Sequence, residues 1–296
     1  MAINKNSNKY TIIYTIVMVV IVGALLAFLA TSLKDRQAEN VLNEQKNSIM
    51  KAFGAEDGDF DKDVKVFCLD TETGESVEQK ESSDIEKVFS LISNRKELAA
   101  ADNNLPYFTY EREVEHEDQK VKETLYVMPL VGKGLWGDIW GYVSLKNGNN
   151  GWEVTGIVMD HAGETPGLGA EIATEKVQKQ FEGMRLFDGD TFALKMLKNG
   201  KDNKEYIEGC SVDAISGGTK TCDGVNLMLE NSLVKYEALF NAVEVDAPET
   251  DVEGIEESVD NVDNVDDTEE SEEPVADVEE SEELATDNVE LKSEEE

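Results

Sequence analysis

The chain has 296 residues, which is enough for one domain of ordinary size with additional segments. It carries 27 Lys or Arg against 64 Asp or Glu, so its formal net charge is −37. The sequence holds no cluster of basic residues to meet phosphates, and this excludes nucleic acid as a partner.

An apolar segment near the N-terminus comes first in chain order. Residues 12–33 carry no charge, and these 22 residues are long enough to cross the hydrocarbon core of a membrane as a helix. A cleaved signal peptide is the main alternative, but its apolar core is usually about 7–15 residues long. We therefore expect an uncleaved anchor over residues 1–34. Basic residues lie on both sides of it, and their count alone slightly favours a cytoplasmic C-terminal domain.

Helical and extended patterns alternate after the anchor. Residues 35–53 have an apolar face with helical spacing, and a glycine-rich string ends it. The partly alternating residues 64–69 predict a strand, and residues 85–100 predict a helix. The charged stretch 102–122 predicts a loop and a hairpin.

Sheet-like patterns dominate the middle of the chain. Strands are predicted at residues 125–131 and 140–145, and the string at 147–151, rich in Asn and Gly, predicts a hairpin turn. Residues 152–159 return as the partner strand. The string at 164–169 contains a proline and two glycines, so we expect a loop there and not the interior of a helix or strand.

Residues 172–243 contain both segments with helical spacing and segments that are typical of strands. Residues 172–184 predict a helix. Residues 191–196 and 206–210 predict strands on either side of a polar turn. A glycine pair then precedes a helical apolar stripe that reaches residue 243.

The string DAISGGT, residues 213–219, lies directly before this last predicted helix. Its glycines allow a tight turn and the close approach of a bulky group. A phosphate at the start of the helix would meet unpaired backbone N–H groups and the positive end of the helix dipole. Thr219 and Thr221 each offer a hydroxyl there. From these residues alone, the commoner interpretation is a glycine turn in which Ser216 or Thr219 caps the helix.

The spacing of Asp213, Ser216, Gly217 and Thr219 resembles the flavinylation motif Asp-x-x-Ser-Gly-x-Thr of the FMN-binding domain family. That family includes the C subunit of the sodium-translocating NADH:quinone reductase and the G subunit of the Rnf complex. The resemblance implies that the Thr219 hydroxyl is esterified to the phosphate of FMN. It also implies an external flavin transferase that uses FAD and a divalent metal. The family usually has Ala where this chain has Gly218.

Two further strings support the resemblance. The string HAGETPGLG at 161–169 is similar to a His-x-x-Glu-Thr-Pro-Gly-Leu-Gly segment of the family, which implies that this loop lines the isoalloxazine ring. The strings GLW at 134–136 and WGY at 140–142 look closer to the quinone reductase member than to the Rnf member. The implied cofactor-binding residues are Thr165, Gly167, Leu168, Ser216, Gly217, Gly218, Thr219 and Lys220, with Asp213 as an element of motif recognition.

For several side chains near these strings, the sequence allows two roles. Asp213 is either a recognition element or a turn residue that binds its own backbone. Lys220 either offsets the phosphate charge or is solvated. His161 is expected to be a hydrogen-bonding loop residue and not a catalytic one. The three tryptophans either approach the flavin ring or pack in the core or an interface, and packing is the commoner case. They are Trp136, Trp140 and Trp152.

No catalytic side chain and no metal site is predicted. The sequence has no Gly-x-Gly-x-x-Gly fingerprint between a strand and a helix, so we expect no site for NADH and a role in passing electrons between partners. Its three cysteines, Cys68, Cys210 and Cys222, are too few and too scattered for a disulfide framework or a zinc site. Cys210 and Cys222 flank the motif and could pair in an oxidising compartment, although buried free thiols are commoner.

The predicted fold is α+β. It has a single N-terminal transmembrane helix within residues 1–34 and an FMN-binding domain over 35–245, with an antiparallel sheet and flanking helices. Residues 246–296 form an acidic tail. From residue 241 to the end there are 25 Asp or Glu and one Lys. Such a segment cannot bury enough apolar area to offset its chain entropy, so we expect it to be disordered.

The resemblance implies an electron relay inside a membrane complex that couples NADH-to-quinone electron flow to sodium export. The other subunits of the complex, the flavin transferase and membrane lipid are the implied partners. The implied location is the inner membrane of a bacterium, with one crossing and the main domain on the periplasmic side. Two alternatives are an Rnf-type G subunit, which serves electron flow between ferredoxin and NAD, and a membrane-anchored binding module without redox chemistry.

Overall fold

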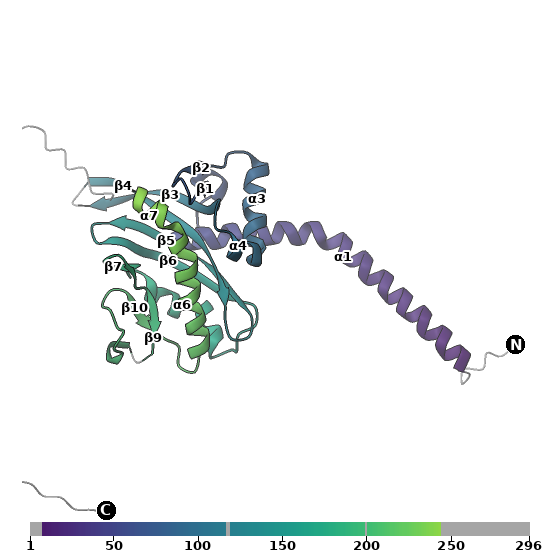
Figure 1. Cartoon of the computed structure of the whole chain (residues 1–296). Coiled ribbons are helices and arrows are strands. Elements are labelled where there is room, and N and C mark those ends of the chain that lie inside the picture. The colour runs from purple at the N-terminus through teal and green to yellow at the C-terminus, as the bar shows by residue number, and fades with distance from the viewer. Residues whose placement is uncertain (1–7, 117–118, 199, 244–296) are drawn as a thin grey trace, which may run out of the picture. The chain divides into compact units, whose positions relative to one another are not determined.

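The computed structural model describes residues 8–116, 119–198 and 200–243. Its first element, α1 (Asn8–Phe53), runs without a break from the apolar segment into the domain (Figure 1). Side chains over residues 12–33 are exposed, and within the described ranges α1 alone is long and apolar enough to cross a membrane. The boundary predicted between residues 34 and 35 falls inside this helix. The predicted acidic tail, 246–296, lies outside the described residues.

The last two turns of α1 enter the core of the domain. Ile49, Met50, Ala52 and Phe53 are buried there. The helix comes very close to the sheet at Gly156, where an added Cβ would lie 2.3 Å from the Ala52 carbonyl oxygen. The helix predicted over residues 35–53 is therefore confirmed, as the end of a longer one. After α1 the chain forms the short helix α2 (Phe60–Asp63) before the first strand.

Six antiparallel strands form the central sheet, in the order β2-β1-β3-β4-β5-β6. The strands are β1 (Val64–Leu69), β2 (Ser76–Glu78), β3 (Leu105–His116), β4 (Gln119–Lys133), β5 (Asp138–Gly148) and β6 (Gly151–His161). The strands predicted at 64–69, 125–131, 140–145 and 152–159 all lie within these elements. The antiparallel sheet of the predicted α+β fold is confirmed.

The stretch 102–122 was predicted as a loop and a hairpin, and the hairpin is confirmed, because β3 and β4 take up most of it. β3 and β4 pair from Phe108 opposite Val127 to His116 opposite Gln119. Their outer halves carry charged side chains in place of an apolar alternation. Ion pairs across the two strands, such as Arg112 with Glu123, join them there. A strand with two polar faces gives no periodic apolar signal to read.

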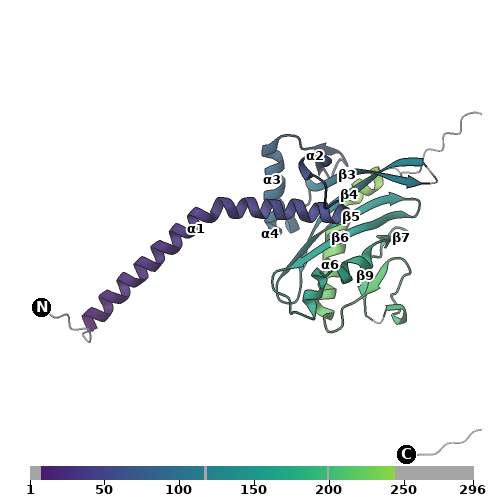
Figure 2. The same cartoon turned by 180° about the vertical axis from the view of Figure 1, so that it is seen from behind.

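Helices cover both faces of the sheet. α6 (Thr219–Leu233) and α7 (Glu237–Ala242) lie across one face, and the end of α1 with α3 (Ser82–Ser93) lies across the other (Figures 1 and 2). Each face has its own buried apolar cluster. The two clusters use opposite sides of the same strands, as the alternation of side chains along a strand requires.

β3 and β4 separate beyond Phe108 and Val127, where their pairing stops. Continuing the same register would place Pro106 opposite Pro129, and neither proline has an N–H to donate. The Pro106 carbonyl accepts a hydrogen bond from the Tyr236 hydroxyl at 2.7 Å instead. The two prolines therefore end the ladder and open the sheet at this point.

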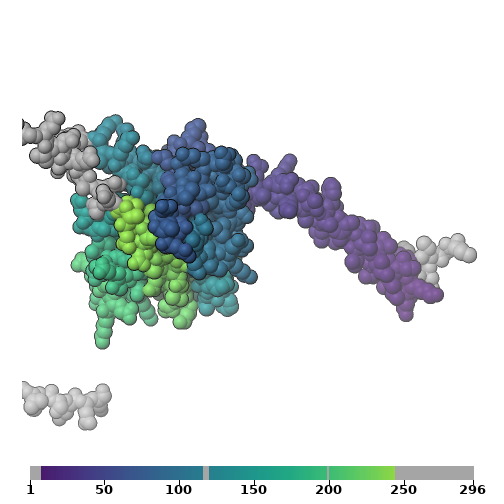
Figure 3. Space-filling model, turned by 45° about the horizontal axis from the view of Figure 1, so that its top comes forward, coloured from purple at the N-terminus to yellow at the C-terminus, as the bar shows by residue number. Residues whose placement is uncertain are grey.

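The short helix α4 (Arg95–Ala100) packs against β4 where the sheet opens. Its Leu98 is buried. Lys235, in η4 (Val234–Tyr236), donates hydrogen bonds to the carbonyls of Ala99 and Ala101. In Figure 3 the blue segment that contains α4 accordingly lies against the yellow-green surface of α6 and α7.

Short elements fill the chain between β6 and α6. They are η1 (Gly169–Ala173), α5 (Glu175–Gln178), η2 (Lys179–Phe181), β7 (Phe187–Asp188), β8 (Thr191–Phe192), β9 (Lys195–Leu197), η3 (Gly200–Asp202) and β10 (Ser211–Asp213). The helix predicted over 172–184 is found in part, because the helical residues form three short pieces and end at Phe181. The Thr174 hydroxyl bonds back to the Glu171 carbonyl and separates the first two turns.

The strand predicted at 191–196 is found in part, as β8 and β9, whereas the strand predicted at 206–210 was wrong. β9 pairs with β10 in parallel, and β10 begins only at Ser211. A side chain of α6 sets the position of β9, because the Asn226 amide accepts from the Met196 N–H and donates to the Met196 carbonyl. A contact of this kind between distant segments cannot be read from local periodicity.

Candidate functional site

The helix predicted after the DAISGGT string begins at Thr219, with Gly218 in the capping position. In the described part of the chain, no side chain makes a capping hydrogen bond to this end of α6. The interpretation of Ser216 or Thr219 as a hydroxyl cap is therefore wrong. The first turn of α6 keeps backbone N–H groups that a ligand can use.

The turn before α6 brings two distant strings into contact. Gly217 has a φ of +75°, in the left-handed region that favours glycine. An added Cβ on Gly217 would lie 2.6 Å from Cδ2 of Leu168. Gly167 also has a positive φ, of +76°, at the tight turn that presents Leu168. The glycines of both strings thus allow the two loops to pack against each other.

A cavity of about 140 Å³ lies where these loops meet the start of α6. Six of the predicted site residues line it, and they are Thr165, Leu168, Gly217, Gly218, Thr219 and Lys220. Gly167 and Ser216 adjoin lining residues in the chain but do not line the cavity. Its other lining residues are Leu135, Glu164, Gly169 and Thr221.

Asp213 lies away from the cavity, at the end of β10. Its backbone N–H donates to Oε1 of Gln180 at 3.2 Å. Its exposed carboxylate lies against Gly200, where an added Cβ would come within 2.6 Å of Oδ1. Among the described residues this carboxylate accepts no hydrogen bond from its own turn, so it is free to meet a partner at the surface.

Glu164 ties the walls of the cavity together. Its side chain is buried, with 4% of the residue exposed. Oε2 accepts a hydrogen bond from the Thr221 hydroxyl of α6 at 2.7 Å. Oε1 accepts from the Trp136 N–H at 2.8 Å. One carboxylate therefore joins the loop after β4, the loop after β6 and the first turn of α6.

The charge of Glu164 is stabilised where it lies. Burial alone raises the pKa of the Glu164 carboxyl, but the hydrogen bonds from two backbone N–H groups and the Thr221 hydroxyl outweigh burial, so the pKa falls below its ordinary value. Glycines leave room for the carboxylate, because an added Cβ on Gly134 or Gly169 would lie 2.5 Å or 2.6 Å from one of its oxygens.

The two hydroxyls at the start of α6 differ in access. Thr221 is buried, with 2% of the residue exposed, and its hydroxyl is already bonded to Glu164. Thr219 is exposed on the cavity rim, and no residue described here hydrogen-bonds its hydroxyl. A group attached to Thr219 would enter the cavity without displacing an internal contact.

Close backbone packing fixes α6 against the end of β4. An added Cβ on Gly132 would lie 2.6 Å from Cβ of Met228. An added Cβ on Gly224 would lie 2.2 Å from the Lys133 carbonyl oxygen. Glycine at both positions lets the helix approach the strand, and this contact sets the distance between Thr219 and the loop after β4.

The structure also shows the contacts of Lys220, His161 and the two cysteines that flank the motif. Lys220 is exposed and forms an ion pair with Asp223 at 3.1 Å. His161 accepts the Glu164 N–H at its Nδ1 at 3.1 Å, which agrees with a hydrogen-bonding loop role. Cys210 and Cys222 are buried free thiols, so the pairing between them is not made.

Of the three tryptophans, only Trp136 lies beside the cavity. Its backbone is bonded to Glu164, yet 70% of the residue is exposed. Trp152 packs in the core against Phe240, with ring centroids 4.8 Å apart. Trp140 lies on the other face of the sheet, under the guanidinium of Arg95.

The residues present fit the phosphate end of FMN. The exposed Thr219 hydroxyl, the free N–H groups of α6 and a turn that only glycine tolerates lie together. The cavity is smaller than the range of about 300–1,000 Å³ that encloses a drug-sized ligand. A flavin ring would therefore extend over the rim, where Leu135, Trp136 and Leu168 are exposed.

Three lining residues were not predicted as site residues from the sequence, and they are Leu135, Glu164 and Gly169. All three belong to the quoted motif strings, whereas Thr221 was named only as a possible hydroxyl at the start of the helix. Thr221 follows Thr219 by two residues on a helix, so its hydroxyl turns inward where the other turns outward. A buried carboxylate bonded to two segments that are distant in sequence has no local signal.

The chain is similar to known proteins over most of its length. The FMN-binding domain family matches residues 134–234. The C subunit of the Na(+)-translocating NADH-quinone reductase of Neisseria meningitidis serogroup B is 30% identical over 75% of this chain and 88% of its own length. The corresponding protein of Vibrio anguillarum is 28% identical over 76% of this chain and 90% of its own length.

Solved structures show the same architecture. The crystal structure of the C subunit of the Na(+)-translocating NADH-quinone reductase from Parabacteroides distasonis matches with a TM-score of 0.52 and 26% identity. The match covers 71% of this chain and 96% of that one.

Proposed function

Because this chain belongs to the family of the C subunits of Na(+)-translocating NADH-quinone reductases, we propose that it relays electrons through an FMN attached to Thr219 by its phosphate. The observation that carries the proposal is the exposed Thr219 hydroxyl at the start of α6, on a cavity formed by both motif strings. The chain acts as one subunit of an oxidoreductase complex.

Each part of the site has a role toward the phosphate. Backbone N–H groups of the first turn of α6 donate to its oxygens, and the positive end of the helix dipole favours its charge. Ser216 and the two glycines of the turn let the phosphate approach the backbone. Lys220 exchanges its surface ion pair with Asp223 for an electrostatic contact with the phosphate.

The opposite wall holds the flavin ring. FMN, when bound, supplies the redox chemistry, and the protein supplies its position and surroundings. Thr165, Gly167 and Leu168 present a loop against the ring, while Leu135 and Trp136 offer apolar and aromatic surface at the rim. Glu164 holds these two loops at a fixed distance from Thr219.

Attachment requires a partner enzyme. A threonine hydroxyl is a weak nucleophile without a base bonded to it, and among the described residues none hydrogen-bonds the hydroxyl of Thr219. A flavin transferase would join the hydroxyl oxygen of Thr219 to the FMN phosphorus of FAD. The pyrophosphate bond breaks, AMP leaves, and the transferase removes the hydroxyl proton. Asp213, exposed and unbonded through its carboxylate, is the recognition element for that enzyme.

The proposal also assigns a place in the cell. α1 crosses the bacterial inner membrane once, with the domain on the periplasmic side and the other subunits of the complex as neighbours. A covalent bond suits this location, because a dissociated FMN outside the cytoplasm could not be replaced from the cytoplasmic pool.

In-gel fluorescence tests the proposal. Wild-type chain produced with its transferase should give a fluorescent band after denaturation, and Thr219→Ala should give a dark one. Thr191→Ala should keep the band, because Thr191 is an exposed threonine outside the cavity. Mass spectrometry of the tryptic peptide should find the added FMN on Thr219. An unmodified Thr219 in matured wild-type protein would refute the assignment.

A further inference from the structure

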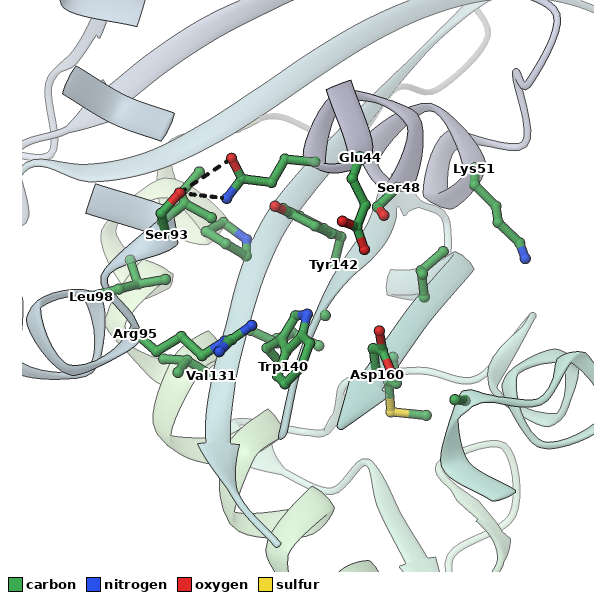
Figure 4. Close-up of a pocket in the computed structure, with 18 of the residues that line it drawn as sticks. Glu44, Ser48, Lys51, Ser93, Arg95, Leu98, Val131, Trp140, Tyr142 and Asp160 are labelled. Atoms are coloured by element: carbon green, nitrogen blue, oxygen red, sulfur yellow. Dashed lines mark hydrogen bonds between the residues drawn. The ribbon is translucent and has the colours of Figure 1, made fainter. Parts of the chain in front are cut away.

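A second cavity, of about 640 Å³, lies on the face of the sheet that α1 covers (Figure 4). Its walls come from the last four turns of α1, the α3–α4 connection, strands β4 to β6, and Ala173 and Gln178. None of its lining residues borders the flavin cavity. It is large enough for a ligand or for several side chains of a partner.

Arg95 is the most specific feature of this cavity. Its Cζ lies 3.4 Å from the centroid of the Trp140 ring, so the guanidinium is stacked on the indole. Within the described part of the chain it forms no hydrogen bond and no ion pair. A stacked guanidinium presents its N–H groups at its edges, in the geometry that binds a carboxylate through two hydrogen bonds.

Tyr142 adds a second donor. The residue is buried, with 4% exposed, and its hydroxyl group reaches the cavity on the side of Ser93 (Figure 4). Burial raises the pKa of the Tyr142 hydroxyl far above its ordinary value, while Arg95 lowers it and Glu44 raises it by smaller amounts. The hydroxyl therefore stays protonated and able to donate.

The cavity also contains charged side chains of both signs besides Arg95. Glu44 and Lys51 come from α1, and Asp160 comes from the end of β6. Asp160 accepts the His161 N–H, but none of these three forms an ion pair with another described residue. Figure 4 places Glu44 and Lys51 on the α1 side of the cavity, whereas Asp160 lies beside Trp140, its partner on the neighbouring strand. A simple anion would pair only with Arg95. A polypeptide segment can bring an acidic side chain to Arg95 and a basic side chain to Glu44.

The distance of the cavity from the apolar segment of α1 argues against a membrane lipid as its ligand. Its α1 residues, Val41 to Lys51, lie 8 to 18 positions beyond Leu33, the end of the apolar run. At 1.5 Å per residue this is about 12–27 Å along the helix. The headgroup region adds only about 5–8 Å on each side of the hydrocarbon core. The cavity is therefore within reach of the extramembrane part of a neighbouring protein.

We propose that this cavity receives an extramembrane segment of a neighbouring subunit, through an Asp or Glu side chain bound by Arg95 on Trp140. This rests on the proposed place of the chain in a membrane complex, but it does not depend on the flavin at Thr219. The docking contact and the flavin cavity use opposite faces of the sheet, so the neighbour would hold the domain without covering the flavin.

Charge reversal in the assembled complex tests the contact. Full-length tagged chain is purified in mild detergent, and the other subunits recovered with it are quantified. Arg95→Glu should lower the recovery of the other subunits at least about tenfold. Arg95→Lys should give a recovery between those of wild type and Arg95→Glu, because lysine keeps the positive charge but lacks the planar guanidinium. Lys96→Glu is the matched control, since Lys96 is exposed and outside the cavity, and should change recovery less than twofold. Unchanged assembly of Arg95→Glu would overturn the proposal.

Cross-linking in an otherwise wild-type chain separates docking from a folding defect. A photoreactive residue at Ser48, which lines the cavity, should capture a peptide of another subunit that contains Asp or Glu. The same residue at the exposed Val77 should not capture that peptide. Capture of lipid, of a second copy of this chain, of its own acidic tail or of nothing would each overturn the proposal. In-gel fluorescence of the same samples reports the flavin separately, so either proposal can fail alone.

Discussion

At the scale of single residues, Glu164 decides the geometry of the flavin cavity. The sequence pointed to hydroxyls and glycines, which contact the cofactor in the proposed function. The carboxylate is needed for a different reason, because it holds Trp136 and Thr221 at a fixed separation. A buried carboxylate is stable only when hydrogen bonds replace the water it has lost, and Glu164 has them from both walls.

Replacement of Glu164 by glutamine keeps its size but removes one acceptor. Either the Trp136 N–H or the Thr221 hydroxyl should then face an amide NH₂ group in place of an oxygen. We expect a loss of about 1–3 kcal/mol in the free energy of unfolding. Urea unfolding of the wild-type and Glu164→Gln chains measures it. Glu171→Gln, at a partly exposed glutamate of η1, is the control and should change the free energy by less than about 0.5 kcal/mol.

The same carboxylate predicts a pH dependence. Its folded-state pKa lies below the ordinary value of 4.5, so it stabilises the folded chain fully above pH 4.5. This contribution is lost as the pH falls from there through the folded-state pKa. The difference in unfolding free energy between wild type and Glu164→Gln should therefore shrink as the pH is lowered below about 4.5. A difference that stays constant across this acid range would contradict it.

At the scale of elements, local signals predicted the segments that are rich in buried apolar residues. Strands β1, β5 and β6 and the helical stripe of α6 are examples, and the two motif strings lie at the end of β6 and the start of α6. The charged halves of β3 and β4 gave no such signal. The parallel pair of β9 and β10 depends on Asn226 of α6, a contact between distant segments. Residues 172–184 alternate between short turns because side chains bond back to the backbone there.

The site itself was predictable as two strings but not as one cavity. Thr219, Gly217 and Leu168 could be named from their motifs, whereas their contact required the positive φ of Gly217 and the seating of α6 on β4. That seating depends on Gly132 and Gly224, which belong to neither motif. Sequence patterns do not reveal such close backbone approaches.

Gly224 gives a test in which two effects oppose each other. Alanine is favoured over glycine inside a helix by about 1 kcal/mol. The added Cβ would, however, lie 2.2 Å from the Lys133 carbonyl oxygen, a backbone atom that cannot move cheaply. We expect the steric clash to outweigh the higher helix propensity of alanine, with a net loss of about 1–3 kcal/mol in the free energy of unfolding and a lower flavin content. Thermal unfolding and in-gel fluorescence of Gly224→Ala measure the two effects.

Gly148→Ala provides the matched control for that clash. Gly148 lies at the end of β5, where an added Cβ meets no atom within 4 Å. The substitution should leave flavin content at the wild-type level and change the unfolding free energy by less than about 1 kcal/mol. Equal effects of both substitutions would show that helix seating does not govern the flavin site.

At the scale of the described molecule, the central sheet separates two cavities. α6 forms the flavin cavity on one face, and the end of α1 forms the Arg95 cavity on the other. The two faces are joined through strands whose alternate side chains enter different apolar clusters. Because α1 carries the apolar segment that is long enough to cross a membrane and also enters the second cluster, this segment and the domain are joined by one continuous helix.

Truncation at two points tests this continuity. A chain that starts at residue 35 loses the apolar segment but keeps Ile49, Met50 and Phe53, so it should be soluble and folded. A chain that starts at residue 54 loses these three buried side chains. At about 1.5–3 kcal/mol each, their loss approaches the roughly 5–15 kcal/mol that holds a typical domain together. We expect the shorter chain to lack a cooperative thermal transition, as measured by circular dichroism. Equal melting temperatures for the two chains would mean that α1 contributes nothing to the domain core beyond its role as an anchor.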